Sequence, residues 1–356
     1  MKKEIGSEFH SADLFKKKKK KIFAKLSDYV LTFSGRTAIE TVILNEPSIK
    51  TVMIPSYCCS SMLEPFINNK INIKYYSVDY KNEFTIKFED LSEVDAILWC
   101  NYFGYHIKMP ELTNFKARGG IVIEDITHSL FSKEIYNWQS DYVVASLRKW
   151  LPLLSGGYCG KIKGTLNYKP NKYPSEKYLN IKRNAMDLKK QYLNGAENID
   201  KNIFLNLFTT ANKWIEKNYS RVVIDDFSKK ILENIDYDTL INKRYENAKI
   251  IIEGLKDCKC VEVIESSSER GCPLFIPIMV KYDYRDDLRN VLISKNVYCP
   301  VHWPRPNEHC CSNFYDSELS LICDQRYDGK DMNRIVGIIK EWDEKRNIER
   351  RGICNE

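Results

Sequence analysis

The sequence predicts an α/β protein in which a mostly parallel sheet lies between helices and is followed by a smaller α+β domain. Between residues 51 and 146, short apolar runs alternate with helix-like segments, as in sheets whose strands are joined by helices. The chain has 356 residues, which suits one large domain and one smaller domain. We therefore expect a basic arm over residues 1–30, a large domain over 31–235 and a small domain over 236–356.

Each expected element follows from a local pattern of apolar residues and of turn-forming residues. The expected strands of the large domain are Thr51–Ile54, Ile73–Val78, Ala96–Cys100, Ile121–Ile123 and Tyr142–Ala145. Its expected helices are Ser60–Asn68, Met109–Lys116, Phe204–Asn218 and Lys229–Gly254. In the small domain we expect strands at Cys260–Ile264, Leu274–Val280 and Val297–Cys299, and helices at Arg285–Ser294 and Asp331–Lys345.

The positive charge of the chain is concentrated in one place. The net charge is +7, and the six lysines of Lys16–Lys21 leave +1 for all other residues (7 − 6 = 1). A nucleic-acid or membrane-surface patch is one interpretation, and a solvated arm is the other. No aromatic residue interrupts the run, so it offers bases no stacking platform, and we expect no nucleic-acid partner.

Other features of the composition predict a cytoplasmic protein. No apolar stretch reaches 18 residues, so no membrane span is expected, and Met1–His10 is too polar for a secretory signal. The 12 cysteines follow no disulfide framework, which favours reduced thiols. The spacings around Cys258, Cys260 and His302 match no zinc motif, so no metal is expected.

Two strands of the predicted sheet run directly into residues that can carry chemistry. Asp125 follows the strand at Ile121–Ile123, and in an open α/β sheet ligands bind beyond the carboxyl ends of the strands. A carboxylate there can keep the ring nitrogen of a cofactor protonated, although an aspartate after a strand is also a common turn former. Lys149 follows the strand at Tyr142–Ala145, and a lysine held off water can act as a nucleophile. The alternative for Lys149 is an ordinary surface lysine.

A third pattern is the turn at Ser34-Gly35-Arg36-Thr37, which leads into a helix. The free amides at a helix N-terminus bind phosphate, and a glycine lets the backbone approach closely. The alternative is a plain capped helix start with Ser34 as the cap.

Taken together and in this order, the three patterns resemble the DegT/DnrJ/EryC1/StrS family of pyridoxal-phosphate (PLP) aminotransferases, often called sugar aminotransferases. The resemblance runs from about Ser34 to Glu341 but is strong only in patches. The patches are residues 34–38, 54–57, 124–129, Lys149 with Gly156-Gly157, and residues 301–304 with residues 319–321. The resemblance implies the aspartate-aminotransferase fold and a homodimer with the active site at its interface.

The resemblance also implies roles for individual residues. Lys149 would form the Schiff base with the cofactor and shuttle the proton, and Asp125 would pair with the ring nitrogen. His128 would support Asp125 or the 3-hydroxyl region, and Thr127 would lie against one face of the ring. The phosphate would be bound by Gly35, Arg36, Thr37 and Ser146. Tyr57 is the expected stacking residue, and Arg326 and His302 are the expected substrate contacts, with a surface ion pair as the alternative for Arg326.

The implied reaction transfers an amino group from an amino acid, with L-glutamate as the expected donor, to a keto group. The acceptor would be a nucleotide-linked sugar or a small phosphorylated ketone, in surface-polysaccharide or natural-product biosynthesis. Three departures point to a divergent branch. Cys58-Cys59 follow Tyr57 where an aromatic residue is usual, and Ser146 precedes Lys149 by only three residues. The asparagine-rich loop that dimers of the family use to reach the partner's phosphate is not obvious over residues 163–196. Three alternatives stay open: another PLP reaction such as a lyase or desulfurase, a non-catalytic relative, and a binding protein that uses the basic arm.

Overall fold

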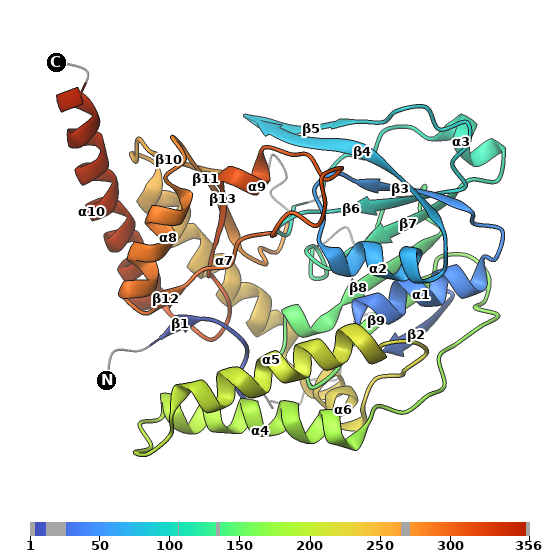
Figure 1. Cartoon of the computed structure of the whole chain (residues 1–356), viewed down its shortest axis with the longest axis horizontal. Helices are drawn as coiled ribbons and strands as arrows, with labels where there is room; N and C mark the ends of the chain where they lie inside the picture. The colour runs from blue at the N-terminus through green and yellow to red at the C-terminus, as the bar shows by residue number, and fades with distance from the viewer. Residues whose placement is uncertain (1–3, 12–25, 106, 133–135, 265–270, 354–356) are drawn as a thin grey trace.

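A computed structural model describes residues 4–11, 26–105, 107–132, 136–264 and 271–353 of the chain (Figure 1). The lysine run Lys16–Lys21 lies outside these residues. Within the described ranges, no helix is long and apolar enough to cross a membrane. The same residues contain no group of three or more His, Cys, Asp or Glu side chains placed to hold a metal ion.

The large domain is built on one eight-stranded sheet with the strand order β2-β9-β8-β7-β6-β3-β4-β5. In that order the strands are Asp28–Thr32, Gly157–Lys161, Tyr142–Ser146, Ile121–Asp125, Ala96–Cys100, Thr51–Pro55, Asn72–Lys81 and Glu83–Lys87. The five strands from β8 to β4 are mutually parallel, whereas β9 and β5 run antiparallel to their neighbours. The predicted mixed, mostly parallel sheet is therefore confirmed.

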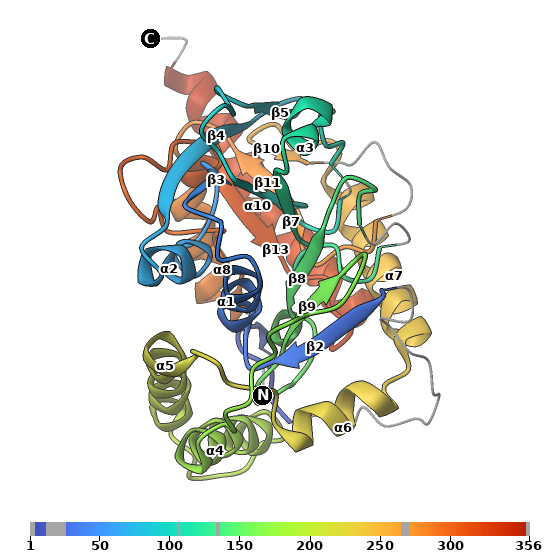
Figure 2. The ribbon, with the colours of Figure 1, turned by 90° about the vertical axis from the view of Figure 1, so that its right-hand side faces the viewer.

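Both faces of this sheet are covered by helices. Successive side chains of each strand point to opposite sides, so each strand contributes residues to the apolar layers on both faces. In β8, Val144 packs into the core beneath α1 (Gly35–Asn45) and α2 (Ser60–Asn68), whereas Val143 packs on the opposite side with residues of α6 (Asp226–Asn234). The helices α4 (Glu176–Leu193) and α5 (Lys201–Asn218) pack against each other around a separate apolar cluster at one end of the sheet (Figure 2).

Four of the predicted helices have different bounds in the structure. The helix expected at Phe204–Asn218 begins earlier, at Lys201, and the helix expected at Asp331–Lys345 is longer, over Gly329–Ile353. The other two differ more. The helix expected at Met109–Lys116 is only α3 (Thr113–Ala117), because Gln139 holds the preceding backbone out of a helix by bonding Pro110 O and Leu112 N. The helix expected at Lys229–Gly254 is divided into α6 and α7 (Tyr237–Leu255). The break falls where Ile235 is extended and Asp236 caps α7, its carboxylate accepting from Thr239 N.

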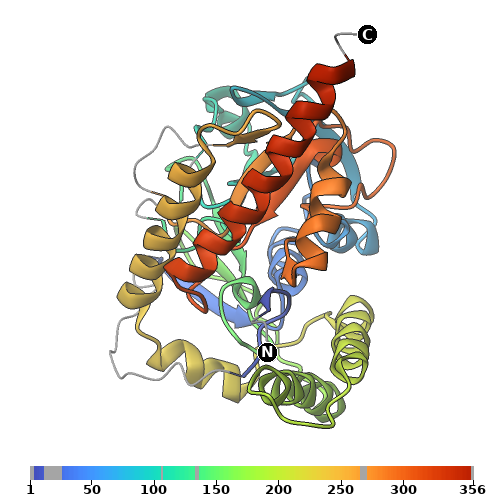
Figure 3. The same cartoon turned by 90° about the vertical axis from the view of Figure 1, so that its left-hand side faces the viewer.

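The small domain has a three-stranded antiparallel sheet in the order β10-β11-β13 (Val261–Val263, Ile276–Val280 and Glu318–Leu321). One face of this sheet packs against α7, α8 (Arg285–Ser294) and α10 (Gly329–Ile353), as Figure 3 shows. The short helix α9 (Phe314–Ser317) directly precedes β13. The predicted division at residue 236 falls between α6 and α7 and stays a prediction.

The described residues of the N-terminus, 4–11, are packed against the rest of the molecule. Its strand β1 (Ile5–Gly6) pairs in parallel with β12 (Val297–Tyr298) of the small domain. Gly6 is required there because its φ is +93° and a Cβ would lie 2.2 Å from Tyr298 O. Farther along, Ser11 Oγ donates to Asp187 of α4 at 2.7 Å. The first described residues therefore link the small domain to α4.

Candidate active site

A cavity of about 170 Å³ lies where the parallel strands of the large sheet end. Its wall includes Asp125 at the end of β7, Ser146 at the end of β8, Lys149 in the following 3-10 turn, and Gly35 at the start of α1. The sheet brings these residues together because the carboxyl ends of parallel strands meet at one edge. The other residues of the wall are Ser34, Arg36, Ile39, Cys59, Ser61, Met62, Cys100, Asn101, Tyr102, Thr127, His128, Arg148 and Trp303.

Asp125 presents a carboxylate to this cavity in surroundings that disfavour a lone negative charge. Its Oδ1 accepts from Thr127 N at 2.8 Å. Burial raises the pKa of Asp125, while the bonds from Thr127 and the charge of Lys149 act in the opposite direction. A cationic partner beside the carboxylate would relieve the desolvation, so the site fits a protonated ring nitrogen.

Thr127 ties the end of β7 to the end of β8. Its hydroxyl accepts from Ser146 N at 2.9 Å, and its carbonyl accepts from the Trp150 indole N–H at 2.6 Å. These two bonds fix the turn on which Lys149 stands. Lys149 Nζ lies 5.5 Å from the centre of the Trp303 ring, which comes from the small domain.

His128 is buried in the wall as a neutral imidazole. Its Nδ1 accepts from Phe103 N at 3.1 Å, so its proton is on Nε2. Burial, and then the charges of Lys149 and His302, place the pKa of His128 well below the usual value. The Nε2 atom is buried and has no partner among the described residues, so this N–H is available to a ligand in the cavity.

The start of α1 closes one end of the cavity. Gly35 lets the helix approach β8, because a Cβ there would lie 3.3 Å from Ser146 Cβ. The amides of Gly35 and Arg36 precede the first intrahelical hydrogen bond, so they are free to bind an anion. The Arg36 guanidinium, in contrast, is paired with Glu64 of α2.

Two of the residues predicted for this site do not line the cavity. Thr37 points its hydroxyl into the protein, where it donates to Tyr219 O at 2.8 Å. Tyr57 is stacked on Phe314 with ring centres 4.4 Å apart, and its hydroxyl donates to His302 O. The aromatic side chains that do face the cavity are Tyr102 and Trp303.

A second cavity of about 510 Å³ shares Ser146, Arg148 and Lys149 with the first. His302 lies in its wall, where Nδ1 is 2.7 Å from Ser320 Oγ and the backbone N–H donates to Glu318 at 2.7 Å. Burial lowers the pKa of His302 although Glu318 acts in the opposite direction. Other parts of the wall come from the N-terminal residues 7–9.

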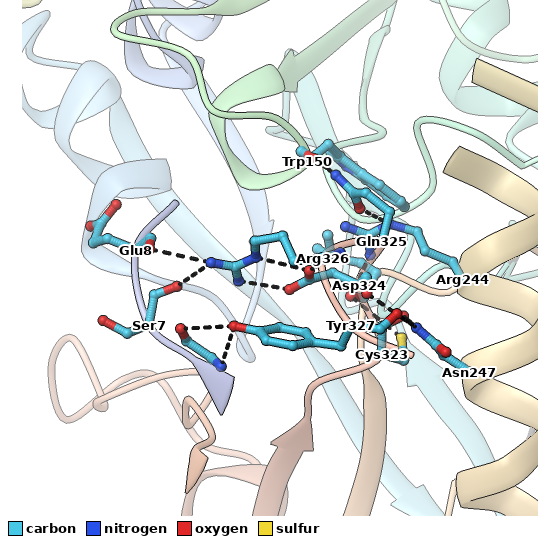
Figure 4. Close-up of polar contacts among 12 residues, drawn as sticks. Ser7, Glu8, Trp150, Arg244, Asn247, Cys323, Asp324, Gln325, Arg326 and Tyr327 are labelled. Carbon is cyan, nitrogen blue, oxygen red and sulfur yellow. Dashed lines mark hydrogen bonds and ion pairs between the residues drawn. The ribbon is translucent and has the colours of Figure 1, made fainter. Parts of the chain in front are cut away.

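Arg326 also lines the second cavity, but its guanidinium is already paired (Figure 4). Its Nε and Nη2 donate to the two carboxylate oxygens of Asp324 at 2.9 and 2.7 Å. Its Nη1 lies 3.3 Å from the carbonyl oxygens of both Ser7 and Glu8, and the Phe9 ring packs 4.2 Å from the guanidinium carbon. The alternative of an ion pair is therefore the one observed, although the pair is buried rather than exposed.

Sequence reasoning missed several residues of the two cavities. Arg148 was not predicted, because the neighbouring Lys149 was taken as the functional residue of that turn. Asn101 and Tyr102 follow β6, at the same edge of the sheet as Asp125. Their position after a predicted strand was the signal that could have found them. Trp303 lies within a patch that carried the family resemblance, but no role was assigned to it.

No protein-family model and no curated protein matches the chain. Among solved structures, it is similar to Spr1654 of Streptococcus pneumoniae in its PLP form, which is described as a sugar aminotransferase. The two are 11% identical, the match covers 91% of this chain and 89% of that one, and the TM-score is 0.60. The sugar aminotransferase CalS13 of Micromonospora echinospora is 15% identical, with 88% and 87% covered and a TM-score of 0.58. A DegT DnrJ EryC1 StrS aminotransferase of Brucella abortus is 15% identical, with 89% and 86% covered and a TM-score of 0.57. The chain thus has the PLP-enzyme fold of these sugar aminotransferases.

Proposed function

We propose that the chain is a PLP-dependent aminotransferase that takes an amino group from an amino acid, with L-glutamate as the donor to test first. The acceptor would be a keto group on a nucleotide-linked sugar or on a small phosphorylated ketone. The observation that carries the proposal is that Asp125, Lys149 and the free amides of α1 surround one cavity. The homodimer, the cytoplasmic location and the biosynthetic setting stay predictions from the family resemblance.

Bound PLP would supply a protonated ring that accepts the electron pair of a substrate carbon. The Asp125 carboxylate would accept a hydrogen bond from the ring N–H, and the two charges would compensate each other in the buried site. The amides of Gly35 and Arg36, with the hydroxyl of Ser146, would bind the phosphate. His128 would donate from Nε2 to an oxygen of the ligand.

Lys149 would hold and move the proton of the reaction. Lys149 lines both cavities, so it is placed to serve a cofactor in the first and a substrate in the second. A lysine can accept a proton as the amine and return it as the ammonium, so one side chain can serve as both general base and general acid. Trp303 covers Lys149 and would help to keep bulk water away.

The absorbance spectrum of the purified protein tests this proposal. We expect added PLP to give a visible band that glutamate abolishes, and we expect Lys149→Ala to lack the band. Lys177→Ala, which removes an exposed lysine of α4, is the matched control and should behave as the wild type. A folded wild-type protein that develops no band would refute the assignment of Asp125 and Lys149. A band indifferent to every amino donor would leave the cofactor in place and refute the aminotransferase.

A further inference from the structure

The second cavity has a strongly positive wall. Five cationic side chains line it, namely Arg148, Lys149, Arg244, Arg289 and Arg326, against the two acidic side chains Glu8 and Asp324. The balance is three positive charges (5 − 2 = 3). Such a wall favours an anionic ligand, because burying like charges together without a counter-ion is unfavourable.

Three of the four arginines already have partners. Arg326 is paired with Asp324, as described above. Arg244 donates to Gln325 Oε1 at 2.9 Å and to the carbonyl oxygens of residues 273 and 274, and it packs on the Trp150 ring (Figure 4). Arg289 donates from Nε to Cys299 O at 3.4 Å. These side chains support the wall and its backbone.

Arg148 differs from the other three arginines. Among the described residues, its Nε is buried without a hydrogen-bond partner. Glu8 is close enough for Arg148 to help lower the pKa of that carboxylate to about 2, but Glu8 bonds Lys182 and Asn212 instead. A buried N–H that has lost water without gaining an acceptor is costly, so the position of this one nitrogen, on a side chain that is otherwise partly exposed, indicates a ligand oxygen.

We infer that Arg148 binds the α-carboxylate of the amino donor while the donor's amino group lies at Lys149. This inference rests on the proposed function. Arg148 and Lys149 are adjacent in one 3-10 turn, and both line the two cavities. The amino and carboxylate groups of an α-amino acid are attached to one carbon, so two neighbouring side chains suit the two groups. A planar guanidinium matches a carboxylate with two parallel hydrogen bonds.

The cofactor phosphate is the other anion that Arg148 could reach, because Arg148 also lines the first cavity. The carboxylate is favoured because the free amides of α1 already provide a phosphate site, whereas Arg326, the arginine expected to bind the carboxylate, is occupied. Arg148 is therefore assigned to binding of the donor.

The test is the reaction of the PLP-loaded protein with L-glutamate, followed as loss of the visible band in a single turnover. Arg148→Gln should retain the band but need about 10- to 150-fold more glutamate for half-maximal rate, the range for losing hydrogen bonds to a charged group. The maximal rate should change much less. Arg148→Lys should lie between the two, because it keeps the charge and loses the fork. Arg346→Gln, the same change in an ion pair of α10, is the matched control and should equal the wild type.

Three results would overturn the inference. Weak PLP binding by Arg148→Gln, with normal binding by Arg346→Gln, would assign Arg148 to the cofactor phosphate. A lower maximal rate at unchanged glutamate dependence would assign it to the chemical step, and wild-type behaviour would assign it no role. If Arg148→Gln does not fold, Arg148→Lys is held to the same criteria. A wild-type protein whose band is indifferent to glutamate and to every other amino donor would instead refute the proposed function.

Discussion

Replacing Arg326 with methionine is predicted to destabilise the whole fold. Arg326 and Asp324 form a bidentate pair in which the aspartate is only 4% exposed. Removing the arginine leaves a buried carboxylate without its partner, which typically costs about 3–5 kcal/mol. Arg244 also lowers the pKa of Asp324 and would still do so, and we therefore expect a loss of about 3 kcal/mol in the free energy of unfolding.

Denaturant-induced unfolding measures this loss, and two further variants make the measurement specific. Arg326→Met combined with Asp324→Leu should recover most of the stability, because neither charge of the pair is then left buried without its partner. Arg346→Met removes a partly exposed ion pair with Asp287 and should cost at most about 1 kcal/mol.

The reasoning would be refuted if Arg326→Met unfolded within about 1 kcal/mol of the wild type. If that variant were also at least tenfold weaker for glutamate at an unchanged maximal rate, the role predicted from the sequence would be restored. Arg326 would then be the carboxylate-binding residue, and its pair with Asp324 would have to open when substrate binds.

Three further predictions concern packing, pH and thiol chemistry. Gly157→Ala should destabilise the protein by about 1–3 kcal/mol in thermal unfolding, because the new Cβ would lie 2.2 Å from Ser34 O; an unchanged melting temperature would contradict the packing of β9 on the start of α1. Burial lowers the pKa of His10 to about 4, so the folded state binds fewer protons than the unfolded state, and stability should fall as the pH drops from about 6.5 to 4. His10→Asn should show a weaker dependence, with the remainder due to the buried His128 and His302, and a pH profile parallel to that of the wild type would contradict the prediction. The buried Cys58 and Cys310 sulfurs are 3.8 Å apart, so excess glutathione disulfide should oxidise the two thiols to one disulfide with release of two reduced glutathiones; peptide mapping that finds both thiols free would contradict this proximity.

The elements predicted best from the sequence are those whose pattern is set locally. The strand at Ala96–Cys100 and the helix at Ser60–Asn68 have the predicted bounds, because apolar runs and turn residues mark them directly. The helix expected at Met109–Lys116 is shorter because its backbone is held by Gln139, a residue of the next βα unit. No local pattern reports such a contact.

The candidate site also contains some residues whose positions could be predicted from the sequence and others whose surroundings could not. Asp125 and Lys149 could be placed at one edge of the sheet, because each follows a recognisable strand and parallel strands end together. The surroundings of Tyr57 could not be predicted, because its neighbour Phe314 is brought to it by the small domain. The burial of Arg326 was hidden for a similar reason, since Phe9 and the backbone of the N-terminal residues cover it.

The pairing of β1 with β12 has a consequence for the order in which the protein can fold during synthesis. Ile5 and Gly6 are made first, yet their partners Val297 and Tyr298 follow about 290 residues later, and the Tyr327 hydroxyl that bonds Gly6 N comes later still. Domains generally fold from the N-terminus as the chain emerges. Residues 7–9, which form part of the wall of the second cavity, can therefore take their place only after the last part of the chain has been made. The large sheet can therefore form on the ribosome well before the second cavity is complete.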